Sequence, residues 1–126
     1  MVMDRLPKKM MDMVEESLKE GETIKAVVEG RTGEAVIVTD QRVLTVNEGT
    51  VLQPFEREEI TGVKLSRRTR VGRFELLVKD PEKYMVDKEK DCIFSPDLSR
   101  NIVNFPYMKF PAFQTVEKEI NALIGE

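Results

Sequence analysis

The first apolar positions of the chain recur at helical spacing. From Leu6 onward they return along one face, which predicts a helix within residues 1–21. Proline is tolerated only in the first turn of a helix, so Pro7 places the start close to Asp4 or Leu6, and Gly21 marks the end. The methionine-rich face of this helix has two open interpretations: it packs against the core, or it forms a surface for self-association.

Between residues 22 and 109 the pattern changes to short apolar runs separated by turn residues. Such runs, with turn signals about every eight to twelve residues, are typical of an antiparallel sandwich or barrel. Pro54 indicates a sheet edge or a break, because proline cannot donate a ladder hydrogen bond. Val71 and Gly72 are expected to form the turn of one hairpin. The predicted strands span residues 24–29, 35–39, 42–46, 51–55, 61–69, 73–79 and 101–109.

The remaining segments are an irregular stretch and a second helix. Residues 80–100 are predicted to form a long excursion with one short strand, of which residues 92–94 are the apolar part. Residues 110–126 are predicted to form a C-terminal helix, because apolar residues share one face between positions 113 and 124 and Gly125 follows as a stop. This apolar stripe is able to cover the open end of a half-closed sheet.

The composition limits the classes of function. The chain has 126 residues, a formal net charge of −3, no histidine and one cysteine. This length is typical of one domain, so we expect residues 1–126 to fold as a single unit. A globally basic nucleic-acid binder is not expected at this charge. Without histidine, Ser–His–Asp and Cys–His catalytic sites are excluded, and so are zinc sites built from Cys and His.

The same composition bears on cellular location. The single cysteine, Cys92, cannot form an intramolecular disulfide, and its apolar neighbours predict a buried, inert thiol. The first residues lack the apolar run of a signal peptide, and no stretch approaches the ~20 apolar residues of a membrane span. We therefore expect a cytoplasmic protein.

Three short motifs follow one another along the chain. Residues 18–24 read LKEGETI, residues 35–44 read AVIVTDQRVL, and residues 55–63 read FEREEITGV. They match an L-x-x-G-E-x-I strand entry, a hydrophobic strand followed by T-D/N-x-R-L, and an I-x-x-V strand entry. In their order and spacing they resemble bacterial pleckstrin-homology-like (PH-like) domains of the YokE-like group.

This resemblance implies a mainly β fold with helices. The implied fold is a PH-like barrel of about seven antiparallel strands in two bent, near-orthogonal sheets, with an N-terminal helix and a C-terminal capping helix. Residues 80–100 depart from the family pattern, because they are longer and more charged than usual. The polar residues at positions 39–42 are interpreted as turn chemistry, because aspartate tolerates turn dihedrals and bonds to nearby backbone.

The strongest local charge feature is a run of basic residues on the predicted hairpin after position 60. Because alternate residues of a strand share a face, Lys64, Arg68 and Arg70 could project together. Arginine presents a planar fork of donors that suits phosphate or carboxylate. The candidate anion-binding or partner-binding residues are Lys64, Arg67, Arg68, Arg70 and Arg73.

An alternative explains the same residues without a ligand. The hairpin could be a solvated surface whose charges pair with Glu56, Glu58, Glu59 or the acidic residues from Asp80 onward. No aromatic residue interrupts the basic run, which disfavours base stacking. The basic motif with which many eukaryotic PH domains bind inositol phosphates is also missing, since the first hairpin offers only two basic residues, Lys25 and Arg31.

These features favour a non-enzymatic binding or assembly module. Its expected partner is another protein or a second copy of the chain, joined at an exposed sheet edge to form a homo-oligomer. The alternative is an anion-binding module that contacts membrane phosphates or a nucleic-acid backbone through residues 64–73. An enzyme is not favoured, because no pattern places two carboxylates for acid–base work and residues 30–33 lack the features of a phosphate loop. No cofactor, metal or small-molecule substrate is expected.

Overall fold

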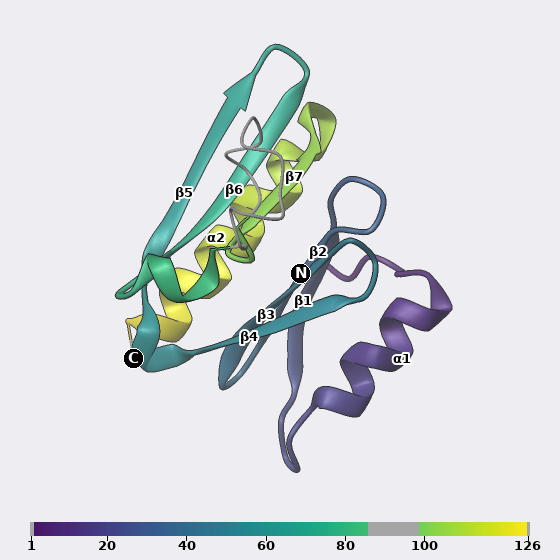
Figure 1. The fold of residues 1–126 in the computed structure, drawn as a ribbon, viewed down its shortest axis with the longest axis vertical. Coiled ribbons are helices and arrows are strands. Elements are labelled where there is room, and N and C mark those ends of the chain that lie inside the picture. Colours follow the sequence, from purple (N-terminus) through teal and green to yellow (C-terminus); the bar gives the residue numbers. More distant parts are fainter. Residues whose placement is uncertain (1, 86–98, 126) are drawn as a thin grey trace.

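The computed structural model describes residues 2–85 and 99–125 (Figure 1). Helix α1 spans Lys8–Ser17 and helix α2 spans Phe110–Ile124. Three short 3₁₀ helices are η1 (Arg57–Glu59), η2 (Pro81–Tyr84) and η3 (Tyr107–Lys109). The strands are β1 (Ile24–Glu29), β2 (Ala35–Thr39), β3 (Arg42–Asn47), β4 (Val51–Glu56), β5 (Ile60–Arg68), β6 (Val71–Val78) and β7 (Ile102–Pro106).

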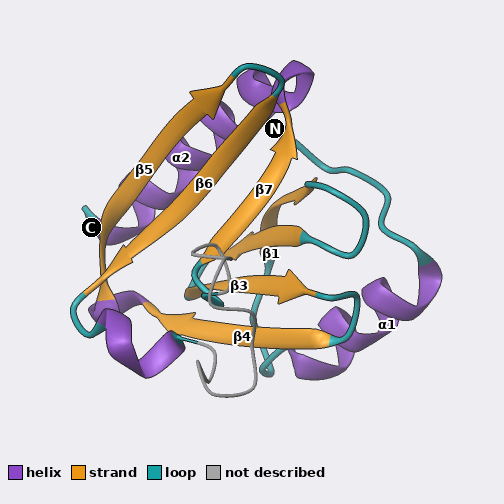
Figure 2. Ribbon diagram, turned by 45° about the horizontal axis from the view of Figure 1, so that its top comes forward, coloured by secondary structure: helices purple, strands orange, loops and turns teal. Residues whose placement is uncertain are grey.

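The strands form two antiparallel sheets. The first sheet has the order β1-β2-β3-β4 and the second has the order β5-β6-β7. Their strands run in different directions (Figure 2), and α2 contacts strands of both sheets. The predicted mainly β fold with an N-terminal and a C-terminal helix is therefore confirmed.

Within the described residues, the two sheets do not close into the barrel that the resemblance implies. Among the described residues, no strand of the first sheet pairs with a strand of the second, so the sheets do not close on each other. Between β4 and β5 the chain turns through η1, whose helical turn interrupts the extended backbone that a continuous ladder needs. On the opposite side, the turn after β1 meets β7 through two hydrogen bonds at Asn104: Arg31 N–H donates to its carbonyl at 2.8 Å, and its N–H donates to Glu34 Oε1 at 2.9 Å.

The first sheet is covered on both faces, which produces two cores. One core lies between the two sheets and α2, and the other lies between the first sheet and α1. In β2, Val36 belongs to the first core and Ile37 to the second. All five residues of this strand are buried, which explains why β2 is a continuous apolar run instead of an alternating one.

Helix α1 begins at Lys8, later than the sequence suggests. Pro7 lies just before the helix with φ −51° and ψ 146°, and its carbonyl accepts the first helical hydrogen bond, from Met11. A residue that precedes proline is disfavoured in the helical conformation, so Leu6 stays extended. Residues 2–4 run parallel to β1, where Met3 forms a β-bridge with Val27.

The methionine-rich face of α1 packs against the core. Met10 and Val14 are buried on the first sheet, and Met11 and Met13 pack partly buried against the same cluster. The core interpretation of this face is confirmed, because the apolar residues that a self-association surface would need are already covered by β1 to β3.

The β5–β6 hairpin turns earlier than expected. Thr69 and Arg70 form the turn, whereas Val71 and Gly72 are the first residues of β6. A Cβ atom at position 72 would overlap the ring of Phe105, which is fully buried. This glycine therefore marks a close approach of a side chain to the backbone and not a turn.

Three further expectations concern single elements. Pro54 lies in β4 at an edge of the first sheet, as its chemistry predicts. The C-terminal helix is confirmed at Phe110–Ile124, with Gly125 after its last turn. The predicted strand at residues 92–94 and the thiol of Cys92 lie outside the described residues. Among the described helices, none is long and apolar enough to cross a membrane.

Candidate anion-binding site

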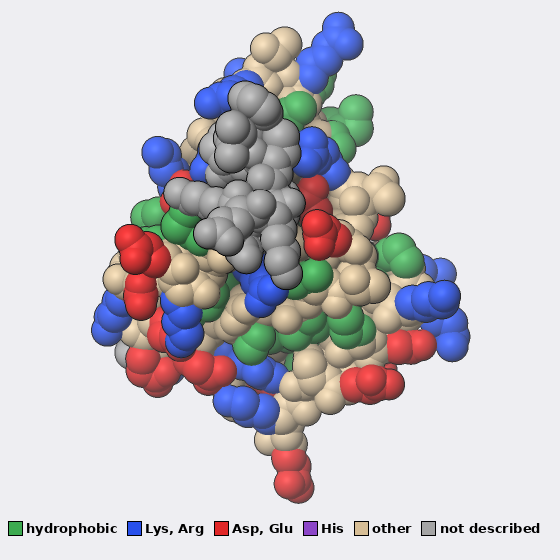
Figure 3. Space-filling model, viewed as in Figure 1, with side chains coloured by type: hydrophobic (Ala, Val, Ile, Leu, Met, Phe, Trp, Pro, Cys, Tyr) green, Lys and Arg blue, Asp and Glu red, His purple; other side chains and the backbone are tan. Residues whose placement is uncertain are grey.

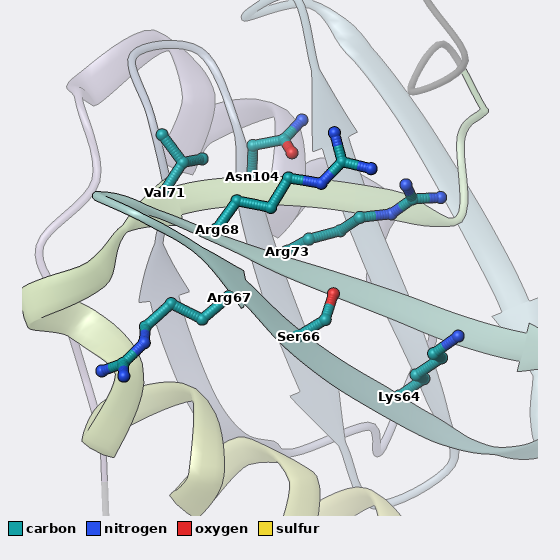
Figure 4. A pocket seen from close by; sticks show the side chains of 7 residues that line it. All are labelled: Lys64, Ser66, Arg67, Arg68, Val71, Arg73 and Asn104. Carbon is teal, nitrogen blue, oxygen red and sulfur yellow. The ribbon is translucent and has the colours of Figure 1, made fainter.

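The second sheet brings polar residues from three strands to one face. Along β5, Lys64, Ser66 and Arg68 alternate with residues that pack against the core, so they project from the outer side. The strand register places Ser66 opposite Arg73 on β6, and Arg73 opposite Asn104 on β7. Figure 4 shows that all five side chains rise from the same side of the sheet.

These side chains surround an open hollow of about 310 Å³. Basic groups dominate its described lining, with a hydroxyl and an amide between them. No carboxylate belongs to this part of the lining. A surface with several N–H donors and no carboxylate in its described lining is suited to an anion. The described lining consists of Lys64, Ser66, Arg67, Arg68, Val71, Arg73 and Asn104.

The arrangement differs from the predicted one at two arginines. Arg70 was expected beside Lys64 and Arg68, but it lies in the turn, where its carbonyl accepts a hydrogen bond from Tyr107 N–H at 3.1 Å. Arg67 points to the opposite side of the hairpin, toward α2 (Figure 4). The third cation of the outer face is Arg73 instead, because the turn lies at positions 69–70 and sets a register that the sequence pattern did not reveal.

Two of the acidic residues proposed as partners of this hairpin are engaged elsewhere. Glu56 contacts Lys19 at 3.2 Å, and Glu59 contacts Lys83 at 3.6 Å. Tyr84 also donates its hydroxyl hydrogen bond to Glu59. For Glu56 and Glu59 the ion-paired form of the solvated-hairpin alternative is thus not supported, and the acidic residues at positions 87–97 lie outside the described residues.

Among the described residues, Arg73 forms an ion pair with Glu75, at a distance of 3.8 Å. No carboxylate among the described residues lies within ion-pair distance of Lys64, Arg67, Arg68 or Arg70. All four of these residues are exposed. Their charges are therefore compensated mainly by solvent and mobile ions, which an anionic ligand can displace.

A second polar cluster is buried and has a different character. Arg42 Nε donates to Glu22 Oε2 at 2.9 Å, and Arg42 Nη2 donates both to Glu22 Oε1 at 3.1 Å and to the carbonyl of Ser17 at 2.6 Å. Thr39 Oγ1 donates to Glu22 Oε2 at 2.6 Å, and Lys19 N–H donates to Oε1 at 2.9 Å. The Glu22 side chain is completely shielded from solvent.

These contacts set the charge state of Glu22. Burial by itself raises the pKa of its carboxyl group, but the hydrogen bonds from Arg42, Thr39 and the Lys19 backbone, together with the charge of Arg42, outweigh it and lower the pKa to about 2. The carboxylate is thus ionised and has a donor on each oxygen. The cluster ties the entry of β1 to the β2–β3 turn, and its residues do not belong to the described lining of the hollow.

The sequence pattern did not predict the Glu22–Arg42 pair, although Glu22 lies in the motif at residues 18–24 and Arg42 in the motif at residues 35–44. Turn chemistry explained Thr39 in part: its hydroxyl oxygen accepts hydrogen bonds from the backbone N–H groups of Gln41 and Arg42. Asp40 instead bonds outside its own turn, to Thr23 N–H at 2.9 Å. The available signal was the joint presence of a glutamate in the first motif and an arginine in the second.

A third charged contact joins the N-terminal segment before α1 to η3. Lys109, at the end of η3, donates to Asp4 Oδ2, and Glu29 N–H donates to the same oxygen at 3.0 Å. Burial works to raise the pKa of Asp4, but these hydrogen bonds and the charge of Lys109 hold it below the ordinary value.

The described residues contain no group of three or more acidic or sulfur side chains arranged to hold a metal ion. Comparison of the chain with models of protein families, with curated proteins and with solved structures found no match. The site must therefore be interpreted from its own geometry.

Proposed function

We propose that the chain is a non-enzymatic binding module with a PH-like fold whose ligand is a phosphate-bearing anion. The observation that carries the proposal is the hollow of about 310 Å³ that Lys64, Arg68 and Arg73 line together. Lys64 and Arg68 are exposed, and neither forms an ion pair with a described carboxylate, although the strand register places Glu75 opposite Lys64. In this arrangement cations from two strands converge on one space, as a multivalent anion requires.

The PH-like part of the proposal is supported by the order of elements. A four-stranded sheet is followed by a three-stranded sheet and a C-terminal helix that contacts both. The three motifs also occupy the expected positions: residues 18–24 lead into β1, residues 35–44 cover the β2–β3 hairpin, and residues 55–63 connect β4 to β5.

The side chains around the hollow have complementary roles in anion recognition. The guanidinium groups of Arg68 and Arg73 offer planar pairs of donors, and the Lys64 ammonium group supplies a compact charge. Ser66 and Asn104 add neutral hydrogen-bond donors between them. Because the site is open to solvent, we expect binding that weakens steeply as the salt concentration rises.

The proposal is tested with pyrophosphate as a soluble probe. In a titration followed by backbone amide NMR signals, the largest shifts are expected in residues 64–73 and at Asn104. A Lys64→Ala, Arg68→Ala variant should bind at least about a hundredfold more weakly, because hydrogen bonds to charged groups contribute about 1.5–3 kcal/mol each.

The matched control is a Lys8→Ala, Lys25→Ala variant, which removes the same charge from exposed positions on α1 and β1. This control should keep the affinity of the original chain. Equal weakening in both variants, or shifts spread evenly over every basic residue, would overturn the proposal, because either result indicates non-specific charge attraction.

Self-association through a sheet edge is the competing candidate. Four strands, β1, β4, β5 and β7, are sheet edges, and two of them, β4 and β5, have a feature that opposes pairing with a second copy. Pro54 removes a donor from β4, and β5 would bring the basic residues of two copies together. Light scattering after size-exclusion chromatography tests this candidate: a dimer that dissociates when a lysine is introduced at Gln53 would favour self-association over the anion site.

A further inference from the structure

Exposed apolar side chains lie beside the basic hairpin turn. Met108 is 75% exposed, Tyr107 46% and Val71 40%, and all three are at the end of the second sheet where β6 begins and β7 ends. Apolar groups of this size are normally placed in contact with other apolar groups, so their concentration at one end suggests a contact surface.

Backbone contacts hold these residues and the turn together. Tyr107 N–H donates to the carbonyl of Arg70 at 3.1 Å, and Val71 is paired with Pro106 in the sheet register. Met108 follows directly in η3. The turn and η3 thus form one surface, which we call the tip: Arg67, Arg68, Arg70, Val71, Tyr107 and Met108.

The tip is surrounded by positive charge. Two segments build this end of the molecule, residues 64–74 and residues 101–116. Together they contain six basic residues and no acidic one. The described carboxylates in contact with these segments are those of Asp4 on Lys109, Glu34 on Asn104 N–H and Glu75 on Arg73, and none of these contacts involves a residue of the tip. In Figure 3, basic and hydrophobic side chains adjoin over the β5–β6 turn at the top of the face shown.

We propose that the tip docks onto an anionic lipid bilayer. Val71, Tyr107 and Met108 enter the interfacial layer, while the flanking arginines contact lipid phosphates. The inference rests on the proposed function, because it takes the lipid headgroup as the source of the phosphate-bearing anion. It adds that the partner is a surface with an apolar layer behind its charges.

The apolar residues distinguish a bilayer from a nucleic acid. A nucleic-acid backbone offers phosphates but no apolar layer, and exposed Met108 and Val71 gain nothing from it. At a bilayer, tyrosine is suited to the headgroup level because its ring is apolar and its hydroxyl is polar. Methionine adapts its shape to a fluid apolar layer. The combination of an apolar point and a basic rim therefore favours the lipid surface.

The expected affinity changes follow from the two contributions. Each basic residue near an anionic membrane strengthens binding by about fivefold, so removal of Arg67, Arg68 and Arg70 should weaken it by about a hundredfold. Replacing Met108 with serine removes a largely exposed apolar side chain that would be buried on docking, which should weaken binding by roughly tenfold.

The chain has no tryptophan, which permits a direct test of insertion. A Met108→Trp variant carries a single tryptophan, at the tip, and a Met85→Trp variant carries one at another exposed methionine, near the far end of β6. With phosphatidylcholine–phosphatidylglycerol vesicles (roughly 2:1), the emission at position 108 should shift to the blue and be quenched by brominated acyl chains. The emission at position 85 should stay unchanged.

The outcomes separate this inference from the proposed function. If pyrophosphate binds at residues 64–73 but vesicles neither sediment the chain nor shift the emission at position 108, the proposed function stands and the membrane inference is wrong. If neither probe binds, both fail. Equal shifts at positions 85 and 108, or a short DNA duplex that binds more tightly than the vesicles, would also overturn docking through the tip.

The charge variants provide the second arm. In vesicle sedimentation, Arg67→Ala, Arg68→Ala, Arg70→Ala should lose about a hundredfold in affinity, whereas Lys8→Ala, Lys9→Ala, Lys25→Ala should lose little. Met108→Ser should weaken binding to the vesicles but leave pyrophosphate binding unchanged, because position 108 does not line the hollow. An unchanged vesicle affinity in Met108→Ser would contradict the inference.

Discussion

Replacing Glu22 with glutamine tests whether the buried ion pair stabilises the fold. The variant keeps the shape of the side chain but removes its charge, so Arg42 is left buried beside a neutral amide. Two donors that now face carboxylate oxygens, Thr39 Oγ1 and Lys19 N–H, must also share a side chain with only one acceptor. The change should therefore destabilise the protein.

The magnitude follows from the pKa of the carboxyl group. Folding lowers the pKa of Glu22 from 4.5 to about 2, and this difference corresponds to about 3 kcal/mol of stability at neutral pH. Removing one partner of a buried pair costs about 3–5 kcal/mol in general, which agrees with this value. At about 1–3 kcal/mol per molar urea, the unfolding midpoint of Glu22→Gln should fall by about 1–3 M.

The pH dependence makes the test specific. Because the folded state has the lower pKa, the contribution of Glu22 is complete above pH 4.5 and decreases as the pH falls toward about 2. The difference in the free energy of unfolding between the original chain and Glu22→Gln should shrink over that window. Urea unfolding followed by circular dichroism at several pH values measures it.

A control variant, Asp12→Asn, removes an exposed pair with Lys8 and should change the stability by less than about 1 kcal/mol. The reasoning would be refuted if Glu22→Gln were as stable as the original chain at pH 7. It would also be refuted if its deficit stayed constant from pH 7 to pH 3.

Three further substitutions are measured by the same urea unfolding. Phe113→Ala should cost about 3–5 kcal/mol, because the buried ring stacks on Phe105 at 3.8 Å; a smaller cost would mean that the site collapses around the cavity. Gly72→Ala should cost about 1–3 kcal/mol, since the added Cβ overlaps the Phe105 ring, and a neutral result would contradict that contact. Thr69→Asn should stabilise by about 0.5 kcal/mol, because Thr69 has φ 37° and asparagine tolerates positive φ better than a β-branched residue; a loss of stability would argue for a role of its side chain.

The candidate site was only partly predictable. The concentration of charge on one hairpin is visible in the sequence, because it depends on residue type and local spacing alone. Which cations face the same space depends on the turn position, and Thr69–Arg70 replaces the expected Val71–Gly72. Moving a turn changes the pairing of the two strands, so Arg73 and not Arg70 lies beside Lys64 and Arg68.

The pattern of apolar positions is sufficient to predict most of the secondary structure, although not its exact boundaries. The period of the apolar positions predicted the seven strands and the C-terminal helix, because a half-buried strand and a half-buried helix require different spacings. It also determined that α1 needs an apolar partner, though not that this partner is the outer face of β1 to β3.

The tertiary structure decided what lies far apart in the chain but close in space. It separated two sheets at η1, where a helical turn interrupts the extended backbone. It joined Glu22 to Arg42 in a buried pair, and it placed Tyr107 and Met108 beside the turn after β5. Contacts of this kind depend on how sheets and helices pack, and local spacing carries no information about residues from different elements that meet across the fold.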